Sequence, residues 1–289
     1  MIMRNILVTG GNGQLGMELK SLLNYDTDFN FIFTSSKELD ITDHKRVKEY
    51  VMKEEIDMII NCAAYTSVDK AEKEQILADA INHLAVANLA QVAKDNNVNL
   101  IHISTDYVFD GLKNSPYVES DDTNPQTVYG KTKLKGELAI KNISPNDSMI
   151  IRTSWLFSRF GNNFVNRIIE LSKTNKKINV ISDQIGSPTN AKDLARAILK
   201  ILPKIKNSNV ELFHFSNKGS CSWYEFAKKT FKINNIKTLL IPVHSDNYKS
   251  TVNRPNYSVL STSKIENKYK FDIPYWVDAL KENFNIINE

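Results

Sequence analysis

The sequence predicts an α/β fold with a doubly wound parallel sheet in its first part and a smaller C-terminal lobe. Continuously apolar runs alternate with helical patterns five or six times before residue 160, as expected of parallel strands buried on both faces. The first run leads into a cluster of glycines, and beyond residue 160 the alternation is less regular. We therefore expect one domain at residues 1–153 and a lobe mainly at 154–289, with segments near 163–216 packing back on the sheet.

The glycine cluster lies in residues 6–16, ILVTGGNGQLG, between an apolar run and a helical pattern. Gly11, Gly13 and Gly16 fit G-x-G-x-x-G, and Gly10, Gly13 and Gly16 fit the looser G-x-x-G-x-x-G. Either spacing removes side chains where a pyrophosphate approaches backbone N–H groups at a helix N-terminus. A glycine-rich turn without a ligand is the alternative. The strand before it and the helix after it favour a Rossmann domain that binds a dinucleotide, with Gln14 and Leu15 in the same turn.

Composition narrows the class of protein further. The net charge is +4 over 289 residues and the lysines are dispersed, which argues against a nucleic-acid partner. Cys62 and Cys221 are the two cysteines, too few for a disulfide framework or a cysteine zinc site. The sequence shows no signal-peptide pattern, and we identify no apolar run of membrane-spanning length. We expect a cytoplasmic protein without membrane or nucleic-acid partners.

Residues 29–36 read as a second strand, and its end meets the adenosine ribose in dinucleotide folds. Ser35, Ser36 and Lys37 at that end suit a 2′-phosphate, which favours NADPH over NADH. Glu38 weakens this preference, and a solvated turn is an equally good interpretation. A polar helix follows near residues 44–51.

Residues 58–65 read as a third buried strand that ends in small side chains. Ala63 and Ala64 would let a cofactor lie against the strand end, or alternatively let a helix pack closely. One or two core helices are expected within residues 68–95.

Residues 100–109 read as a fourth strand that ends in Ser104, Thr105 and Asp106. Ligands of parallel sheets bind at the carboxyl ends of the strands, so Thr105 is a candidate hydrogen-bond donor in the cleft. The polar loop at residues 110–126 is long enough to act as a cover.

Tyr129 and Lys133 lie four residues apart in a predicted helix and so share one face. A nearby ammonium favours phenolate and lowers the pKa of a tyrosine, which makes this pair a candidate proton donor. An exposed surface helix is the alternative interpretation. The position after the fourth strand favours catalysis, because a reductase that binds a dinucleotide at the first turn needs an acid there.

The second half of the chain gives weaker signals. Strands are expected at residues 149–153, 178–181 and 211–215, and helices at 163–171, 191–202, 222–231 and 274–284. Trp155 is a candidate stacking residue or a core aromatic. From Ile241 the pattern becomes loops, where Arg254 is a candidate for binding a diphosphate or an ordinary surface arginine.

Several motifs resemble those of the extended short-chain dehydrogenases: T-G-x-x-G-x-x-G at residues 9–16, N-C-A-A-Y at 61–65, S-T-D-Y-V-F-D-G at 104–111 and Y-G-K-T-K-x-x-G-E at 129–137. A second set is more specific and resembles the dTDP-4-dehydrorhamnose reductases: V-D-K-A-E at residues 68–72, R-T-S-W at 152–155, G-N-N-F at 161–164, D-Q-x-G-S-P-T at 183–189 and R-P-x-x-S at 254–258. The resemblance covers nearly the whole chain.

The resemblance implies reduction of the C4 ketone of dTDP-4-dehydro-L-rhamnose by NADPH or NADH, for cell-surface polysaccharide synthesis. It implies that Thr105 holds the ketone oxygen, Tyr129 protonates it, and Lys133 lowers the tyrosine pKa and binds the nicotinamide ribose. The further cofactor contacts it implies are Gly13, Gln14, Leu15, Asp40, Ile41, Ala63, Ala64 and Tyr65. The substrate contacts it implies are Asp106, Trp155, Asp183, Gln184 and Arg254.

Some members of the resembled family form a dimer bridged by magnesium through two carboxylates. Glu18 matches the first position, but Lys192 stands at the second, with Asp193 beside it. Lysine does not bind this metal, so we expect an active site that needs no metal, in a monomer or a homodimer.

Two other readings remain open. Sugar-nucleotide 4,6-dehydratases and 4-epimerases share the fold, but a dehydratase commonly has Asp-Glu after the threonine, and here Tyr107 follows Asp106. The regulatory beta subunit of methionine adenosyltransferase also resembles these reductases, and it binds NADP without catalysis.

Overall fold

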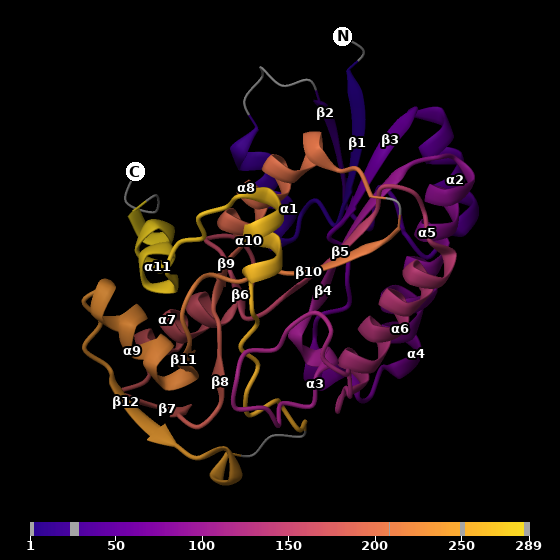
Figure 1. The fold of residues 1–289 in the computed structure, drawn as a ribbon. Helices are drawn as coiled ribbons and strands as arrows, with labels where there is room; N and C mark the ends of the chain where they lie inside the picture. The colour runs from indigo at the N-terminus through magenta and orange to yellow at the C-terminus, as the bar shows by residue number, and fades with distance from the viewer. Residues whose placement is uncertain (1–2, 24–28, 208, 249–251, 286–289) are drawn as a thin grey trace.

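A parallel sheet forms the centre of the computed structural model, which describes residues 3–23, 29–207, 209–248 and 252–285 (Figure 1). Within these residues the sheet has six strands in the order β10-β5-β4-β3-β1-β2. All neighbouring pairs are parallel. The strands are β1 (Arg4–Thr9), β2 (Phe29–Thr34), β3 (Ile56–Asn61), β4 (Asn99–Thr105), β5 (Met149–Thr153) and β10 (Glu211–His214). The predicted doubly wound sheet is confirmed.

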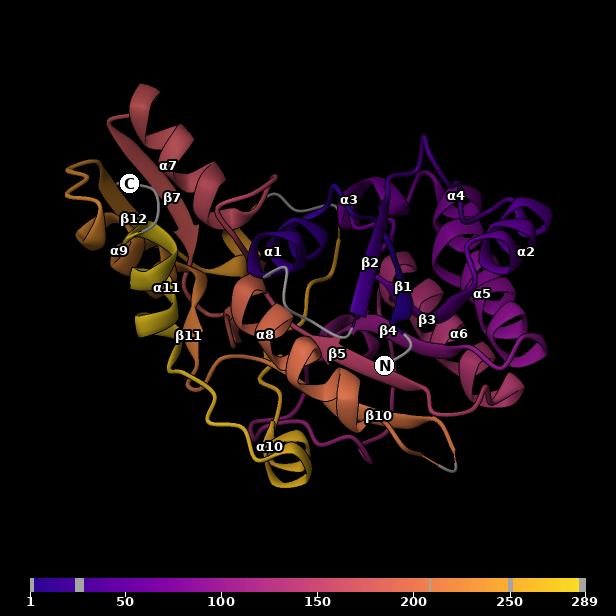
Figure 2. The same cartoon turned by 90° about the horizontal axis from the view of Figure 1, so that it is seen from above.

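Helices cover both faces of this sheet (Figure 2). The elements on one face are α1 (Gln14–Leu22) and α8 (Ala191–Ile201), and those on the other are α2 (His44–Lys53), α5 (Ala85–Asp95) and α6 (Val128–Ile143). Successive strand residues point to opposite faces, so Ile6 and Val8 pack toward α1 and α8, whereas Leu7 packs toward α2 and α5. Burial on both faces explains why the strands read as continuous apolar runs.

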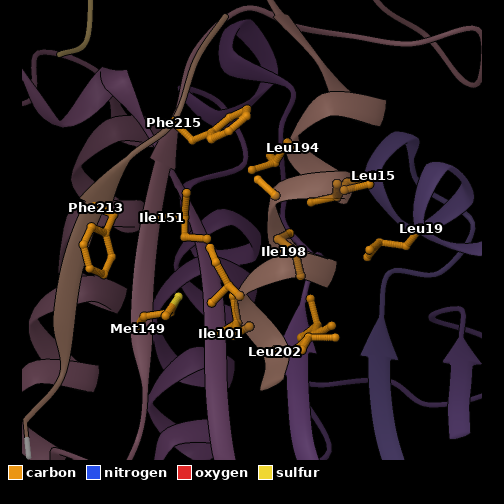
Figure 3. Close-up of a cluster of buried hydrophobic side chains, with 14 of the residues drawn as sticks. Leu15, Leu19, Ile101, Met149, Ile151, Leu194, Ile198, Leu202, Phe213 and Phe215 are labelled. Carbon is orange, nitrogen blue, oxygen red and sulfur yellow. The ribbon is translucent and has the colours of Figure 1, made fainter. Parts of the chain in front are cut away.

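The core on the α8 side is drawn in Figure 3, where Leu194 and Ile198 of α8 lie over Ile101 of β4 and Ile151 of β5. Phe213 of β10 belongs to the same cluster. α8 and β10 follow β5 only after residues 154–190, so the chain leaves the sheet after β5 and returns to it with α8.

The sequence analysis identifies no apolar run of membrane-spanning length, and this prediction is wrong. Within the described residues, the continuous helical segment Gln75–Asp95 is long and apolar enough to cross a membrane, with mean hydropathy 1.2. It comprises α4 (Gln75–Asp79), the π-helical turn η1 (Ala80–Leu84) and α5. Val86 and Leu89 of α5 are fully buried in the core that lies between this helix and the sheet. We therefore assign the segment to the core of the α/β domain.

The remaining elements build a second body beside the sheet. The helices α7 (Phe164–Thr174), α9 (Trp223–Ile233) and α11 (Trp276–Asn285) pack there with the parallel pair β7 (Lys177–Ile181) and β12 (Leu239–Val243). The shorter elements of the chain are α3 (Val68–Ala71), η2 (Asp106–Val108), β6 (Leu156–Phe157), β8 (Ile185–Gly186), β9 (Thr189–Asn190), η3 (Leu202–Lys204), β11 (Cys221–Ser222), η4 (Ser245–Asn247) and α10 (Ser263–Tyr269).

The predicted ends of several strands are wrong by a few residues. The second strand stops at Thr34, the third at Asn61 and the fourth at Thr105, where polar side chains begin to bind the turning backbone. The stretch predicted as loops from Ile241 includes part of β12 and all of η4, and its residues 249–251 lie outside the described part of the chain.

Candidate active site

The glycine turn is shaped by close backbone contacts. Gly10 has a φ of +66°, and a Cβ there would lie 2.7 Å from the backbone nitrogen of Ala63. A Cβ on Gly16 would lie 2.6 Å from the Cα of Gly11, so only glycine lets α1 start this close to the turn. Gly13 is the N-cap of α1, with no side chain capping the helix. This leaves the first N–H groups of α1 without a side-chain partner, which is the condition for an anion to bind at a helix N-terminus.

Two adjoining cavities run from this turn across the carboxyl ends of the strands. One, of about 510 Å³, lies beside β2. The predicted cofactor-binding residues that line it are Gly10, Gly13, Ser35, Ser36, Lys37, Asp40, Ile41, Ala63 and Ala64. The other, of about 600 Å³, lies over β4 and α6. The predicted site residues that line it are Gly13, Gln14, Leu15, Ala64, Thr105, Asp106, Tyr129, Lys133 and Trp155. Asn12, Gly13, Cys62 and Ala64 line both, so the two form one continuous groove.

At the β2 end of the groove, Glu38 holds the donors of the turn. Its Oε2 accepts hydrogen bonds from the backbone N–H and the hydroxyl of Ser35, each 2.7 Å long. The hydroxyl bond, followed by the backbone bond, lowers the pKa of Glu38. A carboxylate thus lies where the sequence predicts a phosphate.

Thr105 and Tyr129 meet at the other end of the groove. Thr105 ends β4, and its Oγ1 donates to Asp106 Oδ1 over 3.0 Å. Tyr129 lies in the first turn of α6, which Thr127 caps by accepting from the N–H of Gly130. Burial raises the pKa of Tyr129 to about 12, and a hydrogen bond with the Thr105 side chain opposes this increase. Tyr129 is therefore a neutral phenol at neutral pH, in contact with the predicted threonine.

Lys133 lies one turn further along α6 and is buried. Its Nζ donates to the carbonyl of Ile103 over 2.7 Å and lies 3.1 Å from Nε2 of His102. Burial lowers the pKa of Lys133 to about 8. Here the amine contacts His102 and Ile103, and burial is the largest cause of the raised pKa of Tyr129, so the lowering of that pKa by the ammonium stays a prediction.

Two glycines of the Y-G-K-T-K-x-x-G-E motif bring α6 close to its neighbours. A Cβ on Gly130 would lie 2.2 Å from the carbonyl oxygen of Tyr107, and one on Gly136 would lie 2.3 Å from that of Asn82. Glu137, which ends the motif, is fully buried and forms a salt bridge with Arg152 of β5 over 2.7 Å. Ser104 of β4 donates to the same carboxylate over 2.5 Å. These contacts fix α6 on the strand ends that carry the site.

Asp106 and Trp155 line the wider cavity, as the sequence analysis predicts for substrate contacts. Burial raises the pKa of Asp106 to about 6, which hydrogen bonds with neighbouring groups oppose. Trp155 has a φ of +46° and stacks on Trp223 at a ring-centroid distance of 3.4 Å. A Cβ on Gly186 would lie 2.4 Å from the indole of Trp155, so the G of the D-Q-x-G segment makes room for this ring.

Other predicted contacts do not line either cavity. Asp183 accepts from the backbone N–H and hydroxyl of Ser245, which places it in a loop contact. Gln184 is buried. Arg254 forms a salt bridge with Asp69 and a hydrogen bond with Tyr107, whose neighbours Asp106 and Tyr129 belong to the site. Tyr65 donates to Glu74, and Gly16 packs within the turn.

The carboxylates considered for a metal have protein partners instead. Glu18 is buried and accepts from Ser158 over 2.6 Å. Asp193 binds Arg196 and Asn217, and Lys192 forms a salt bridge with Glu282 over 3.1 Å. No cluster of three metal-ligating side chains occurs in the described part of the chain.

Some residues of the site escaped the sequence analysis. Asn12, Thr66, Val68, Asn163 and Trp223 line the wider cavity. Trp223 comes from α9, so no local pattern pointed to it. Asn61 and His102 lie behind Lys133, and Asn61 could have been found because it opens the quoted N-C-A-A-Y motif.

Comparisons agree with this geometry. The family model described as the RmlD substrate binding domain matches residues 3–288. The chain belongs to this family. The spore coat polysaccharide biosynthesis protein SpsK of Bacillus subtilis is 39% identical over 280 residues, which cover 97% of this chain and 96% of that protein. A dTDP-4-dehydrorhamnose reductase of Sinorhizobium fredii is 38% identical over 284 residues, covering 96% and 95%.

Among solved structures, a dTDP-4-dehydrorhamnose reductase of Bacillus anthracis in complex with NADP has a TM-score of 0.93 at 38% identity, with 98% and 99% of the two chains covered. The resemblance to the dTDP-4-dehydrorhamnose reductases inferred from the sequence motifs is therefore confirmed for this member of the RmlD family.

Proposed function

We propose that this chain reduces the C4 ketone of dTDP-4-dehydro-L-rhamnose to dTDP-L-rhamnose with NADPH, NADH also serving, for cell-surface polysaccharide synthesis. The observation that carries the proposal is the meeting of Thr105, Tyr129 and Lys133 in a cavity continuous with the glycine turn. Relatives named dTDP-4-dehydrorhamnose reductase over nearly the full chain support the choice of substrate.

A dinucleotide fits the groove on two grounds. The turn between Gly10 and Gly16 leaves no space for side chains and would bring a pyrophosphate to the N-terminus of α1. Ser35, Lys37 and Asp40 would face the adenosine, and Ala64 and Lys133 the nicotinamide half. When bound, the reduced nicotinamide supplies the hydride. Each cavity has a volume in the range usual for ligand sites.

The chain's own groups supply the proton and the orientation. Tyr129 is the proton donor: its high pKa keeps the phenol protonated, and Thr105, by holding the ketone oxygen, places that oxygen beside the phenol. Asp106 and Trp155 would border the sugar ring, with Arg254 near the entrance beside Tyr107. We further propose that residues 154–289 form mainly the substrate-binding lobe, in a cytoplasmic monomer or homodimer with neither nucleic-acid nor membrane partners.

The test is consumption of NADPH on addition of dTDP-4-dehydro-L-rhamnose. Tyr129→Phe removes the proton donor, so we expect kcat to fall by roughly 10²–10⁴-fold. The matched control is Tyr224→Phe, because Tyr224 lies on α9 and lines neither cavity. Binding of NADPH without its oxidation by the unaltered protein would favour a non-catalytic subunit. Dinucleotide that stays bound in stoichiometric amount through dialysis would favour an epimerase or dehydratase.

A further inference from the structure

Trp155 and Trp223 come from distant parts of the chain and lie face to face in the wider cavity. Their ring centroids are 3.4 Å apart and their planes differ by 5°, so the two indoles overlap with little offset. Both side chains are half-buried and line the cavity that Thr105 and Tyr129 share. The proposed function places Trp155 beside the sugar ring and gives Trp223 no role.

Trp155 does not adopt this arrangement by local preference. Its φ of +46° lies in the left-handed region, which is unfavourable for a bulky side chain. Aromatic pairs also favour offset or edge-to-face packing over a face-to-face overlap. Strained residues of this kind persist only where their surroundings impose the conformation, and they gather at ligand sites. The surroundings of the Trp155 ring must therefore hold it in place.

Two short strands bring those surroundings together. β8 pairs with β11, and in this pair Gly186 lies opposite Cys221. A Cβ on Gly186 would lie 2.4 Å from Cε2 of the Trp155 indole and 2.5 Å from its Nε1. Trp223 is the first residue of α9, directly after Ser222, which ends β11 and caps the helix. The β8–β11 pair thus sets both Gly186 and Trp223 against the same indole.

Trp223 is itself held by its neighbours in the lobe. The ring centroid of Phe164 on α7 lies 4.6 Å from that of Trp223, and the centroid of Phe226 lies 6.4 Å from it. Ser222 accepts from the N–H of Glu225, and the Glu225 carboxylate accepts from the N–H of Ser222. This capping box fixes the start of α9. Both the ring and the backbone of Trp223 are therefore fixed by contacts within the lobe.

We propose that Trp223 is a positioning residue for the sugar of the substrate. Together with Gly186 it holds the indole of Trp155 as the apolar wall against which the sugar ring lies. A hexose ring presents C–H groups on its faces, and an indole that is already fixed buries them without being ordered on binding. The inference deepens the proposed function and rests on it in taking a dTDP-linked sugar as the ligand.

The first test compares binding with and without the sugar, by isothermal titration of the full chain with dTDP-L-rhamnose and with dTDP. Trp223→Leu removes the support. We expect its Kd for dTDP-L-rhamnose to rise roughly threefold to tenfold, the factor for one aromatic contact, with the Kd values for dTDP and NADPH unchanged. Trp223→Phe keeps a flat ring and should restore most of the affinity. If the two Kd values for dTDP-L-rhamnose and dTDP rise together, or if neither rises, the proposal is overturned.

Gly186→Ala perturbs the same ring from a different element, because the added Cβ would overlap the indole. We expect it to weaken the binding of dTDP-L-rhamnose by a similar factor and to leave that of dTDP unchanged. In a Trp155→Leu background neither Trp223→Leu nor Gly186→Ala should have a further effect, since both act through the Trp155 ring. A full effect of Trp223→Leu in that background would overturn the positioning role.

The matched control is Trp276→Phe, which alters a tryptophan of the same lobe. Trp276 packs on Phe226 with 5.7 Å between ring centroids, and it lines neither of the two cavities. We expect both Kd values to stay as in the unaltered protein. A rise in the Kd for dTDP-L-rhamnose alone in this variant would mean that any loss of packing in the lobe weakens the sugar, which also overturns the proposal.

The last test needs neither substrate nor activity. The chain has three tryptophans, and single substitutions assign their indole signals in NMR spectra. We expect nuclear Overhauser contacts between the rings of Trp155 and Trp223, and Trp155 ring-proton signals displaced upfield by an amount that Trp223→Leu removes. Absence of contact between the two rings overturns the proposal. A protein that keeps this stack and gains affinity from the sugar, yet never oxidises NADPH, would support the positioning role while refuting the proposed reduction.

Discussion

The surroundings of a buried carboxyl or phenol in the site set its protonation state. Asp106 is 2% exposed and hydrogen-bonded by Thr105. Burial raises its pKa to about 6 from an ordinary value of 3.8. Because the folded value exceeds the unfolded one, this group stabilises the fold fully below about pH 4 and loses that contribution as the pH rises through about 6. Near neutral pH the charged form of Asp106 therefore lowers the stability of the fold.

Asp106→Asn should therefore stabilise the protein near neutral pH. The amide keeps the oxygen that accepts from Thr105 but carries no charge. We expect the free energy of unfolding to exceed that of the unaltered protein by ~1–3 kcal/mol near pH 7, with the difference vanishing near pH 4. Urea unfolding at both pH values measures this. An equal difference at the two pH values would contradict it.

Glu38 also acts at the scale of one side chain, because its carboxylate occupies the donors of Ser35. A 2′-phosphate has to displace this carboxylate, whereas a free 2′-hydroxyl can donate a hydrogen bond to it. We expect Glu38→Gln to tighten NADPH relative to NADH by roughly threefold to tenfold. Fluorescence titration gives the two Kd values. Glu49→Gln on the exposed side of α2 is the control, and an unchanged Kd ratio in Glu38→Gln would sink the idea.

Elements are joined at the site by the buried contacts of Glu137. This carboxylate on α6 binds Arg152 of β5 and Ser104 of β4, so one charge connects the helix that carries Tyr129 to both strand ends. Arg152 also lies over the ring of Phe109, 5.0 Å from its centroid. A buried pair of this kind contributes to the fold chiefly through the cost of leaving either partner alone.

Arg152→Met leaves Glu137 buried without its cation, and we expect a loss of ~3–5 kcal/mol in the free energy of unfolding. Adding Glu137→Leu removes the stranded charge and should recover most of the loss. Urea unfolding of the two variants and of the unaltered protein gives the comparison. If the double variant proves less stable than Arg152→Met alone, the ion pair is not the reason for the loss.

At the scale of the whole molecule, the α/β domain was predictable because its signals are local. Buried parallel strands read as apolar runs, and the glycine turn, Thr105 and Tyr129 follow directly after such runs. What escaped prediction depends on distant contacts: β12 is half-exposed and paired with β7, and Trp223 reaches Trp155 from another element. The contacts of Lys133 also escaped, since they are made with His102 and Ile103 of β4.

Metal removal tests the assembly. Glu18 is bound to Ser158, and Lys192 to Glu282, so these positions offer no ready magnesium bridge. We expect dialysis against EDTA to change neither kcat nor the molecular mass measured by sedimentation. A drop in mass that magnesium reverses, and that Glu18→Gln abolishes, would show that the bridge exists.

The strand order has a consequence for how the polypeptide can be divided. β10 lies beside β5, although residues 154–210 separate them in the chain. A fragment cut after residue 153 would expose the unpaired backbone edge of β5 and strip α8 from Ile101 and Ile151. During synthesis, likewise, this edge waits for its partner until residue 214 has left the ribosome. The nucleotide-binding domain is thus completed by a strand, β10, that follows the first part of the neighbouring lobe in the sequence.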